Sequence, residues 1–235
     1  MRQYFATGIA LAGLMTVGAA QADLINIEAD VQYWSANASG DHTFGDLRFS
    51  GNDWDTEGQT RLSASFEHFL PLIPNIKVAS QTLEFDGKRD QVLSSRIDLS
   101  HDLFTLYYAP LNNDLTTVHF GASYMRISGS VSEFGSGSRS PSESVSEDIG
   151  LGYLRASVGL PFTGFSVFGQ GQFSVGSDHD ISDLEAAVRY RFMDSVIDGH
   201  VSLGYRQAQV KLAHGDQFAT DYRFKGPFLS LSLRF

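Results

Sequence analysis

The chain has 235 residues, of which 42% are hydrophobic and 12% aromatic, while only 19% carry a charge. No internal run approaches the roughly 20 apolar residues of a membrane-spanning helix, which excludes a helical membrane protein. The formal net charge of −10 disfavours nucleic acid as a partner, because proteins bind its phosphates with basic residues. The lack of cysteine excludes disulfide scaffolds and thiolate metal sites. The apolar residues are spread so finely that the mean hydropathy is only −0.13.

The N-terminal segment has the pattern of a secretory signal peptide. Arg2 supplies a positive charge, and residues 7–20 are apolar or small. Ala20-Gln21-Ala22 has the small-x-small form that signal peptidase cleaves. We therefore expect Sec-type secretion, with cleavage after Ala22 separating a signal peptide (1–22) from one mature domain (23–235).

The mature chain alternates between apolar and polar residues with a period of two. Every second residue from Ile25 to Tyr33 is apolar, and the residues between them are polar. This periodicity indicates a strand, because successive side chains of a strand point to opposite faces. The pattern recurs and predicts ten strands, at residues 24–34, 59–70, 76–85, 93–108, 115–131, 148–160, 165–175, 181–192, 199–212 and 222–235.

The connections between these strands alternate in length. Short turns rich in Pro, Gly, Asn and Asp are predicted at 71–75, 110–114, 161–164 and 194–199. Mostly longer, polar connections are predicted at 35–58, 86–92, 132–147, 176–181 and 213–221. Because segment 132–147 is rich in Ser and Gly, we expect a mobile loop there. An even strand number with short turns on one side and long loops on the other is typical of bacterial outer-membrane barrels.

We therefore predict an all-β fold, a single closed antiparallel transmembrane β-barrel. Ten strands are expected, with eight as the alternative, and both termini should lie in the periplasm of a Gram-negative bacterium. In hydrocarbon every backbone polar group must be paired within the protein, so a spanning sheet must close on itself. A soluble barrel with its apolar face inward is the competing interpretation. It is disfavoured because the polar face is rich in Ser, Gly, Gln and Arg, which suit a confined polar lumen.

Two predicted strands change their apolar face midway. Around 149–160 the apolar positions shift from Ile149 and Leu151 to Leu154 and Val158, and 201–212 shows a similar shift. A β-bulge would produce this change. Alternatively, the membrane boundary lies elsewhere than the alternation suggests.

Charged residues on the polar faces should point into the lumen. We expect them to form ion pairs that fill a narrow barrel, because buried charges are tolerated only when paired. The functional alternative is a narrow channel whose charged rings select solutes. The predicted network consists of Glu28, Asp30, Arg61, Glu67, Arg96, Asp98, Asp102, Glu185, Arg189, Arg191, Arg206 and Arg234.

Other groupings allow weaker chemical hypotheses. A ten-stranded barrel resembles the omptin proteases, which activate water with acidic and His residues at the outer rim. The loop groups that could do this are Asp178–His179–Asp180, His214 with Asp216, and Asp86 with Asp90. His119 and Ser123 share a lumen face and suggest a lipid hydrolase. Residues 53–58 are similar to the first half of a calcium loop, but Ala64 stands where a bidentate Glu is required. We expect no catalytic residue, cofactor or metal.

Two segments resemble known outer-membrane proteins. The alternation of Leu229, Leu231, Leu233 and Phe235 resembles the C-terminal signal that the barrel assembly machinery reads, which implies that this machinery assembles the chain. Residues 66–77, FEHFLPLIPNIK, resemble the hairpin motif of a proteobacterial family of small outer-membrane β-barrels of unassigned activity. That resemblance implies a fold and a location.

The predicted function is therefore that of a non-enzymatic outer-membrane barrel, either structural or a narrow or plugged pore with a charged lumen. The alternatives are a binding module that acts through its surface loops and an enzyme at the rim. Its partners should be outer-membrane lipid and lipopolysaccharide.

Overall fold

The computed structural model describes residues 25–50, 53–70, 72–88, 94–113, 115–134, 141–175, 179–214 and 218–235. The regular structure in these ranges is β-strand, and they contain no helix long and apolar enough to cross a bilayer. The predicted signal peptide lies outside the described residues.

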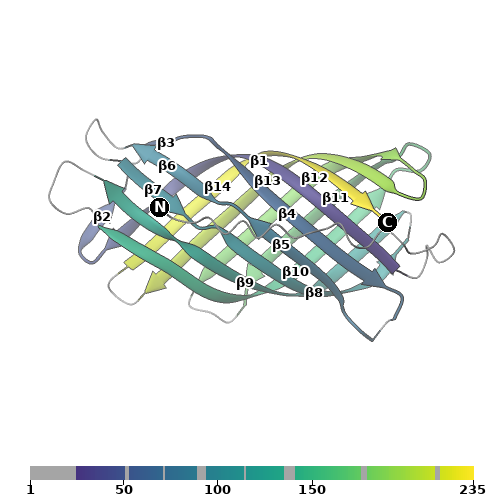
Figure 1. Ribbon diagram of the computed structural model, residues 1–235, viewed down its shortest axis with the longest axis horizontal. Coiled ribbons are helices and arrows are strands. Elements are labelled where there is room, and N and C mark those ends of the chain that lie inside the picture. Colours follow the sequence, from purple (N-terminus) through teal and green to yellow (C-terminus); the bar gives the residue numbers. More distant parts are fainter. Residues whose placement is uncertain are drawn as a thin grey trace, which may run out of the picture.

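Ten strands form one closed antiparallel barrel, in which each strand pairs with the next and the last pairs with the first (Figure 1). This confirms the predicted fold class and strand number. Around the barrel the strands are β1 (Ile25–Phe44), β4 (Glu57–His68), β5 (Asn75–Gln81), β8 (His101–Asn112), β9 (Thr116–Phe134), β10 (Ser142–Gly159), β11 (Phe165–Ser174), β12 (Asp180–Met193), β13 (Asp198–His214) and β14 (Phe218–Arg234).

Four short strands extend the sheet at one end of the barrel: β2 (Leu47–Phe49), β3 (Asp53–Trp54), β6 (Glu84–Lys88) and β7 (Ser94–Asp98). At the opposite end the start of β1 meets the end of the chain after β14, where the backbone amides of Ile27 and Phe235 each donate to the other's carbonyl at 3.0 and 2.8 Å. We call this the terminal end, at the right in Figure 1, and the other the loop end. The two corresponding parts of the barrel are the terminal half and the loop half.

Side chains in the terminal half are arranged as in a membrane-spanning barrel. On β14, Leu229 and Leu231 point outward and are about half exposed, at 52% and 45%. Ser230 and Ser232, between and beyond them, point inward and are buried. An apolar outer surface around a polar interior is what hydrocarbon surroundings require.

The loop half shows the opposite arrangement. Further along β14 toward the loop end, Tyr222 and Phe224 point inward and are completely buried, while Arg223 and Lys225 are exposed outside. A polar outer surface around an apolar interior is the arrangement of a soluble barrel. The barrel therefore changes from one kind of packing to the other along its axis.

This inversion explains the face changes that the alternation shows. β10 pairs with both β9 and β11 without a register shift, and β13 pairs with β14 without one. Ile149 and Leu151 point into the apolar interior of the loop half, whereas Leu154 and Val158 face outward in the terminal half. The second of the two explanations therefore holds: the apolar side changes where the outer surface turns polar, and no bulge is involved.

Several strands are longer than expected. β1 continues to Phe44, and β9 and β10 extend to Phe134 and from Ser142. The expectations of a polar connection over 35–58 and of a mobile loop over 132–147 are therefore wrong for most of the described residues of these stretches. In these stretches Ser, Gly and Asn are frequent on the outward face, as they are in loops, so composition hides the strands.

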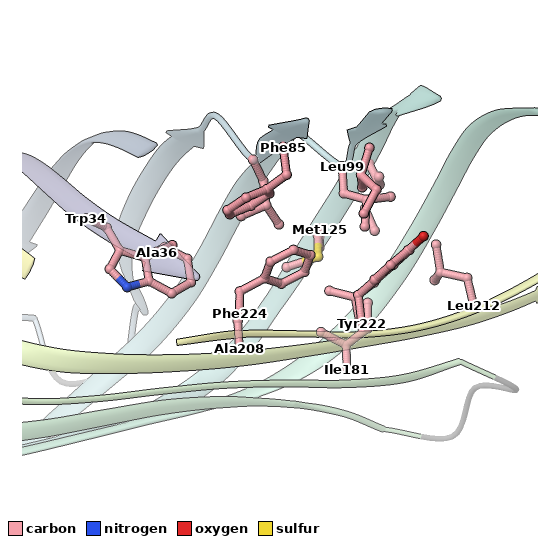
Figure 2. Close-up of a cluster of buried hydrophobic side chains, with 14 of the residues drawn as sticks. Trp34, Ala36, Phe85, Leu99, Met125, Ile181, Ala208, Leu212, Tyr222 and Phe224 are labelled. Atoms are coloured by element: carbon pink, nitrogen blue, oxygen red, sulfur yellow. The ribbon is translucent and has the colours of Figure 1, made fainter. Parts of the chain in front are cut away.

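The interior of the loop half is an apolar core. Trp34 from β1, Phe85 from β6 and Phe224 from β14 converge in it (Figure 2), and the rings of Phe85 and Phe224 stack with centroids 5.0 Å apart. Packing of this kind leaves few voids larger than a water molecule. Other members that are at most 3% exposed are Ala36, Leu83, Ile97, Leu99, Met125, Ile127, Val131, Val145, Ile149, Leu151, Ile181, Leu212, Phe218, Tyr222 and Phe228.

Gly226 lies where the two kinds of packing meet. A methyl group at this position would lie 1.9 Å from the carbonyl oxygen of Ser35 on the neighbouring strand, so only glycine fits. The close approach lets the indole nitrogen of Trp34 donate to the Gly226 carbonyl at 3.1 Å. Trp34 is thereby held across the barrel interior.

Exposed tyrosines border the outward apolar band. Tyr33, Tyr124 and Tyr205 lie at its edge toward the loop end, and Tyr108 and Tyr190 at its edge toward the terminal end. Aromatic girdles of this kind mark the two membrane interfaces of outer-membrane barrels. The exposed aliphatic and phenylalanine side chains of the band include Val31, Leu62, Phe66, Ile76, Val78, Phe104, Leu106, Phe120, Leu154, Val158, Val167, Phe173, Leu184, Val188, Leu203, Leu229 and Leu231.

Candidate functional site

A layer of polar side chains crosses the lumen next to Trp34, on the side toward the terminal end. At its centre is Arg206 of β13, which is 1% exposed. Its Nε and Nη2 donate to the two carboxylate oxygens of Asp183 at 2.9 and 2.6 Å, and its Nη1 donates to Gln32 at 3.1 Å and Gln81 at 2.6 Å. The guanidinium carbon lies 4.4 Å from the centroid of the Trp34 ring. Four strands and the apolar core are therefore joined by one side chain.

A second pair links distant strands in the same layer. Arg61 of β4 forms a bidentate ion pair with Glu185 of β12, in which Nη2 donates at 3.0 Å. Glu185 also accepts from Gln170 at 2.7 Å and lies 3.2 Å from Arg206 Nε. Because β4 and β12 are not neighbours in the sheet, this pair bridges the lumen instead of lying along its wall.

Between the polar layer and the terminal end, the lumen contains a cavity of about 70 Å³. Glu28 is one of its lining residues and receives two cations, Arg234 at 3.3 Å and Arg189 at 3.6 Å. Asp30, Lys77 and Arg155 also line the cavity. This volume is sufficient for a few water molecules, since one buried water needs about 10–15 Å³.

The structure places eight of the twelve predicted lumen charges inside the barrel: Glu28, Asp30, Arg61, Glu67, Glu185, Arg189, Arg206 and Arg234. Arg191 lies at the terminal rim, where it contacts Asp194 at 3.2 Å. Sequence reasoning missed Lys77, Arg155 and Asp183, although each stands at an inward position of an alternating strand.

The prediction that Arg96, Asp98 and Asp102 point into the lumen is wrong. They alternate with Ile97, Leu99 and Leu103, which are buried in the interior, so they lie on the outer surface. Arg96 there donates to Asp86 at 2.7 and 3.1 Å, and these hydrogen bonds raise the pKa of the Arg96 guanidinium above its ordinary value. The error has the same cause as the apparent face change, because in the loop half the polar residues are outside.

The hairpin motif builds the turn between β4 and β5 at the terminal end. The Asn75 side chain accepts from the amide of His68 at 3.0 Å, and His68 Nδ1 accepts from the amide of Leu70 at 3.2 Å. Glu67 accepts from the Tyr107 hydroxyl at 2.8 Å. These residue types are explained by the folding of the turn and its attachment to the lumen wall.

The rim clusters are only partly placed. His179 lies 3.1 Å from Glu147 and is mostly buried, while Asp86 is engaged by Arg96. Asp90, Asp178, Asp216 and the side chain of His214 lie outside the described residues. Of the three proposed acid–histidine or acid–acid groups, none is therefore seen complete.

A buried polar cluster in the loop half was not anticipated. Tyr222 and His42 Nδ1 share a hydrogen bond, His42 Nε2 lies 3.0 Å from Glu133, and Ser95 donates to Glu133. The four residues are at most 3% exposed. The cluster brings together strands far apart in the sequence, so no local pattern could have indicated it.

The proposed hydrolase pair is not joined in the structure. His119 stacks on Tyr107 with ring centroids 5.0 Å apart, and Ser123 shares a hydrogen bond with Thr105 and accepts one from Gln172. The calcium hypothesis gains no support either: Trp54 is packed against Tyr222, and the described residues contain no group of three or more potential metal ligands.

Comparison with known proteins bears on the fold alone. No family model and no curated protein matches the chain. Among solved structures, the outer membrane protease OmpT of Escherichia coli is similar with a TM-score of 0.51 and 11% identity, covering 93% of this chain and 99% of that one. The transport unit of the autotransporter AIDA-I of Escherichia coli gives a TM-score of 0.42 at 7% identity, covering 94% and 92%. OprG of Pseudomonas aeruginosa gives 0.33 at 10%, covering 90% and 95%.

Proposed function

We propose that this chain is a non-enzymatic barrel of the Gram-negative outer membrane whose lumen is closed by its own side chains. The observation that carries the proposal is the inversion of packing along the axis. The terminal half has a lipid-type outer surface and a polar lumen, and the loop half is a soluble-type barrel with a solid apolar core. Such a chain would span the membrane with one half and project the other half from it.

The orientation proposed for the barrel places the terminal end in the periplasm and the loop half outside the cell. Short turns lie at the terminal end and the strand extensions at the other, as is expected for bacterial barrels with short periplasmic turns. We also propose that a signal peptide cleaved after Ala22 directs secretion and that the barrel assembly machinery reads the C-terminal residues Leu229–Phe235. We further propose that the chain belongs to the family with the hairpin motif of residues 66–77.

The non-enzymatic role rests on the state of the polar side chains. In the lumen Arg61 pairs with Glu185 across the barrel and Arg206 pairs with Asp183 on the neighbouring strand. His119 and Ser123 contact other residues instead of each other. OmpT is an outer membrane protease, but its likeness to this chain is one of fold.

Membrane placement predicts a cost that depends on position along one strand. Leu203 and Gln207 both face outward from β13, on either side of Tyr205. We expect Leu203→Arg to lower the free energy of unfolding in lipid vesicles by about 2–4 kcal/mol, and Gln207→Arg by about 0–1 kcal/mol. Urea titrations followed by tryptophan fluorescence measure both. Equal costs at the two positions would falsify the proposed membrane level.

Closure of the lumen predicts that the protein does not conduct. In planar bilayers the full chain should insert without producing stable current steps, because a polar layer and an apolar core lie in series across the lumen. A general porin inserted under the same conditions is the positive control. Reproducible steps from the purified barrel would show that the interior opens and would contradict the closed-barrel proposal.

A further inference from the structure

We propose that the outward face of β14 just beyond the membrane band binds the phosphate groups of lipid A, the lipid portion of lipopolysaccharide. The inference rests on the proposed outer-membrane location and orientation. It concerns Arg223 and Lys225 with the adjoining polar residues Asn37, Ser39 and Gln207, which together we call the β14 basic patch.

The two cations of the patch are exposed and lack an ionic partner. Arg223 and Lys225 are two residues apart on one strand, so their side chains leave the same face. Neither forms an ion pair or a side-chain hydrogen bond with another described residue. The chain has a net charge of −10, so carboxylates are plentiful, yet none pairs with these two adjacent cations. An anion outside the protein would explain their position.

Four other basic residues on the outer surface of the loop half are neutralised, while Lys88, at the end of β6, forms no ion pair with a described residue. Arg48 contacts Asp41, Arg96 contacts Asp86, and Arg126 contacts Asp148. Lys211, on the strand next to the patch, lies 3.7 Å from both Asp180 and Asp221. The nearest acids toward the loop end are thus already paired, which leaves the charge of the β14 basic patch available to an external anion.

The position of the β14 basic patch along the barrel axis indicates which anion it meets. Register places Lys225 opposite Asn37 on one side and Gln207 on the other, and Arg223 opposite Ser39. Two residues further toward the terminal end, Pro227 pairs with Tyr205, and Leu229 beyond it pairs with Tyr33. The patch therefore begins where the exposed tyrosines and the apolar band end, which is the level of lipid headgroups.

The residue types suit a phosphorylated sugar. A guanidinium binds phosphate oxygens through two parallel hydrogen bonds, and an ammonium binds them as a point charge. Gln207 adds a free carboxamide that can bond to sugar hydroxyls. Asn37 accepts from Thr56 through Oδ1 but keeps its amide hydrogens, and Ser39, which donates to the Arg223 carbonyl at 3.4 Å, can still accept. In the proposed orientation this face meets the outer leaflet, where lipid A presents phosphates on a disaccharide.

The test is a titration of the full-length barrel, folded in phosphatidylcholine vesicles, with lipid A, followed by intrinsic fluorescence. The double variant Arg223→Gln/Lys225→Gln should bind lipid A about 30-fold more weakly than the wild type at low salt. This follows from about 1 kcal/mol for each basic residue at an anionic lipid surface, converted at 1.4 kcal/mol per tenfold. Arg223→Lys, which keeps the charge, should retain most of the affinity.

The matched control is Arg126→Gln, which removes a cation just beyond Tyr124 that is already paired with Asp148; it should leave the affinity for lipid A within about twofold of the wild type. The proposal is overturned if the double variant binds like the wild type. It is also overturned if dephosphorylated lipid A, or phosphatidylglycerol at equal charge, binds the wild type as tightly as lipid A does. If the wild type fails to insert into phosphatidylcholine vesicles at all, the membrane proposal itself fails, which separates the two outcomes.

Discussion

Replacing Arg206 by methionine will lower the free energy of unfolding by about 3–5 kcal/mol, because the change leaves a buried charge without compensation. Asp183 receives both of its cationic hydrogen bonds from Arg206, and Gln32 and Gln81 each lose a donor. Glu185 keeps Arg61, so Asp183 bears most of the loss. Urea titration of the folded barrel in lipid vesicles measures the change.

A second substitution distinguishes charge compensation from simple packing. Arg206→Met/Asp183→Leu removes both partners, and replacing a whole buried pair by apolar residues is often neutral, so the double variant should recover at least half of the lost stability. Arg126→Met, which breaks an exposed pair with Asp148, should leave the stability nearly unchanged, because solvent screens exposed ion pairs. If the double variant is less stable than Arg206→Met, the polar layer does not act by compensating charge.

Replacing Phe85 by alanine will cost about 3–5 kcal/mol, as is usual when a buried phenylalanine is truncated in a close-packed core. Phe85 is 1% exposed and stacks on Phe224 from a strand that is distant in sequence. The same chemical unfolding experiment measures this loss. A large cost at this position is expected only if the loop half is a solid apolar core.

The adjacent residue provides the matched control. Glu84 stands on the same strand, and its side chain faces outward and is exposed, so Glu84→Ala should change stability by no more than about 0.5 kcal/mol. A cost at Phe85 no larger than that at Glu84 would mean that the loop half is loosely filled, and the closed-lumen proposal would lose its main support.

Alternation predicts strands without stating which side is inside. Phe224, Leu229 and Leu231 are all apolar members of one C-terminal strand, yet Phe224 faces the core and the two leucines face outward. The residue pattern between them contains the change of face, and it was visible on two other strands as well. Its meaning became clear only from the burial of side chains on neighbouring strands. The misplacement of Arg96, Asp98 and Asp102 has the same origin.

For the lumen charges, too, the sequence predicts the direction of each side chain but not its partner. The inward position of Arg61 and Glu185 follows from alternation on their own strands, since a period of two places every second residue on one face. Their contact with each other does not, because it depends on how the closed barrel brings β4 and β12 into reach across the lumen. The cluster of His42, Glu133 and Tyr222 was missed for the same reason.

By itself, the sequence determined the all-β class, the ten strands, the closed barrel and the short turns at the terminal end. These features depend on local periodicity and turn residues, and on the rule that a sheet in hydrocarbon cannot have an open edge. The tertiary structure alone decided where the outer surface turns from apolar to polar, which charges face each other, and that the loop half is solid. Those properties depend on contacts between strands far apart in the chain, and a one-dimensional pattern does not encode their distances.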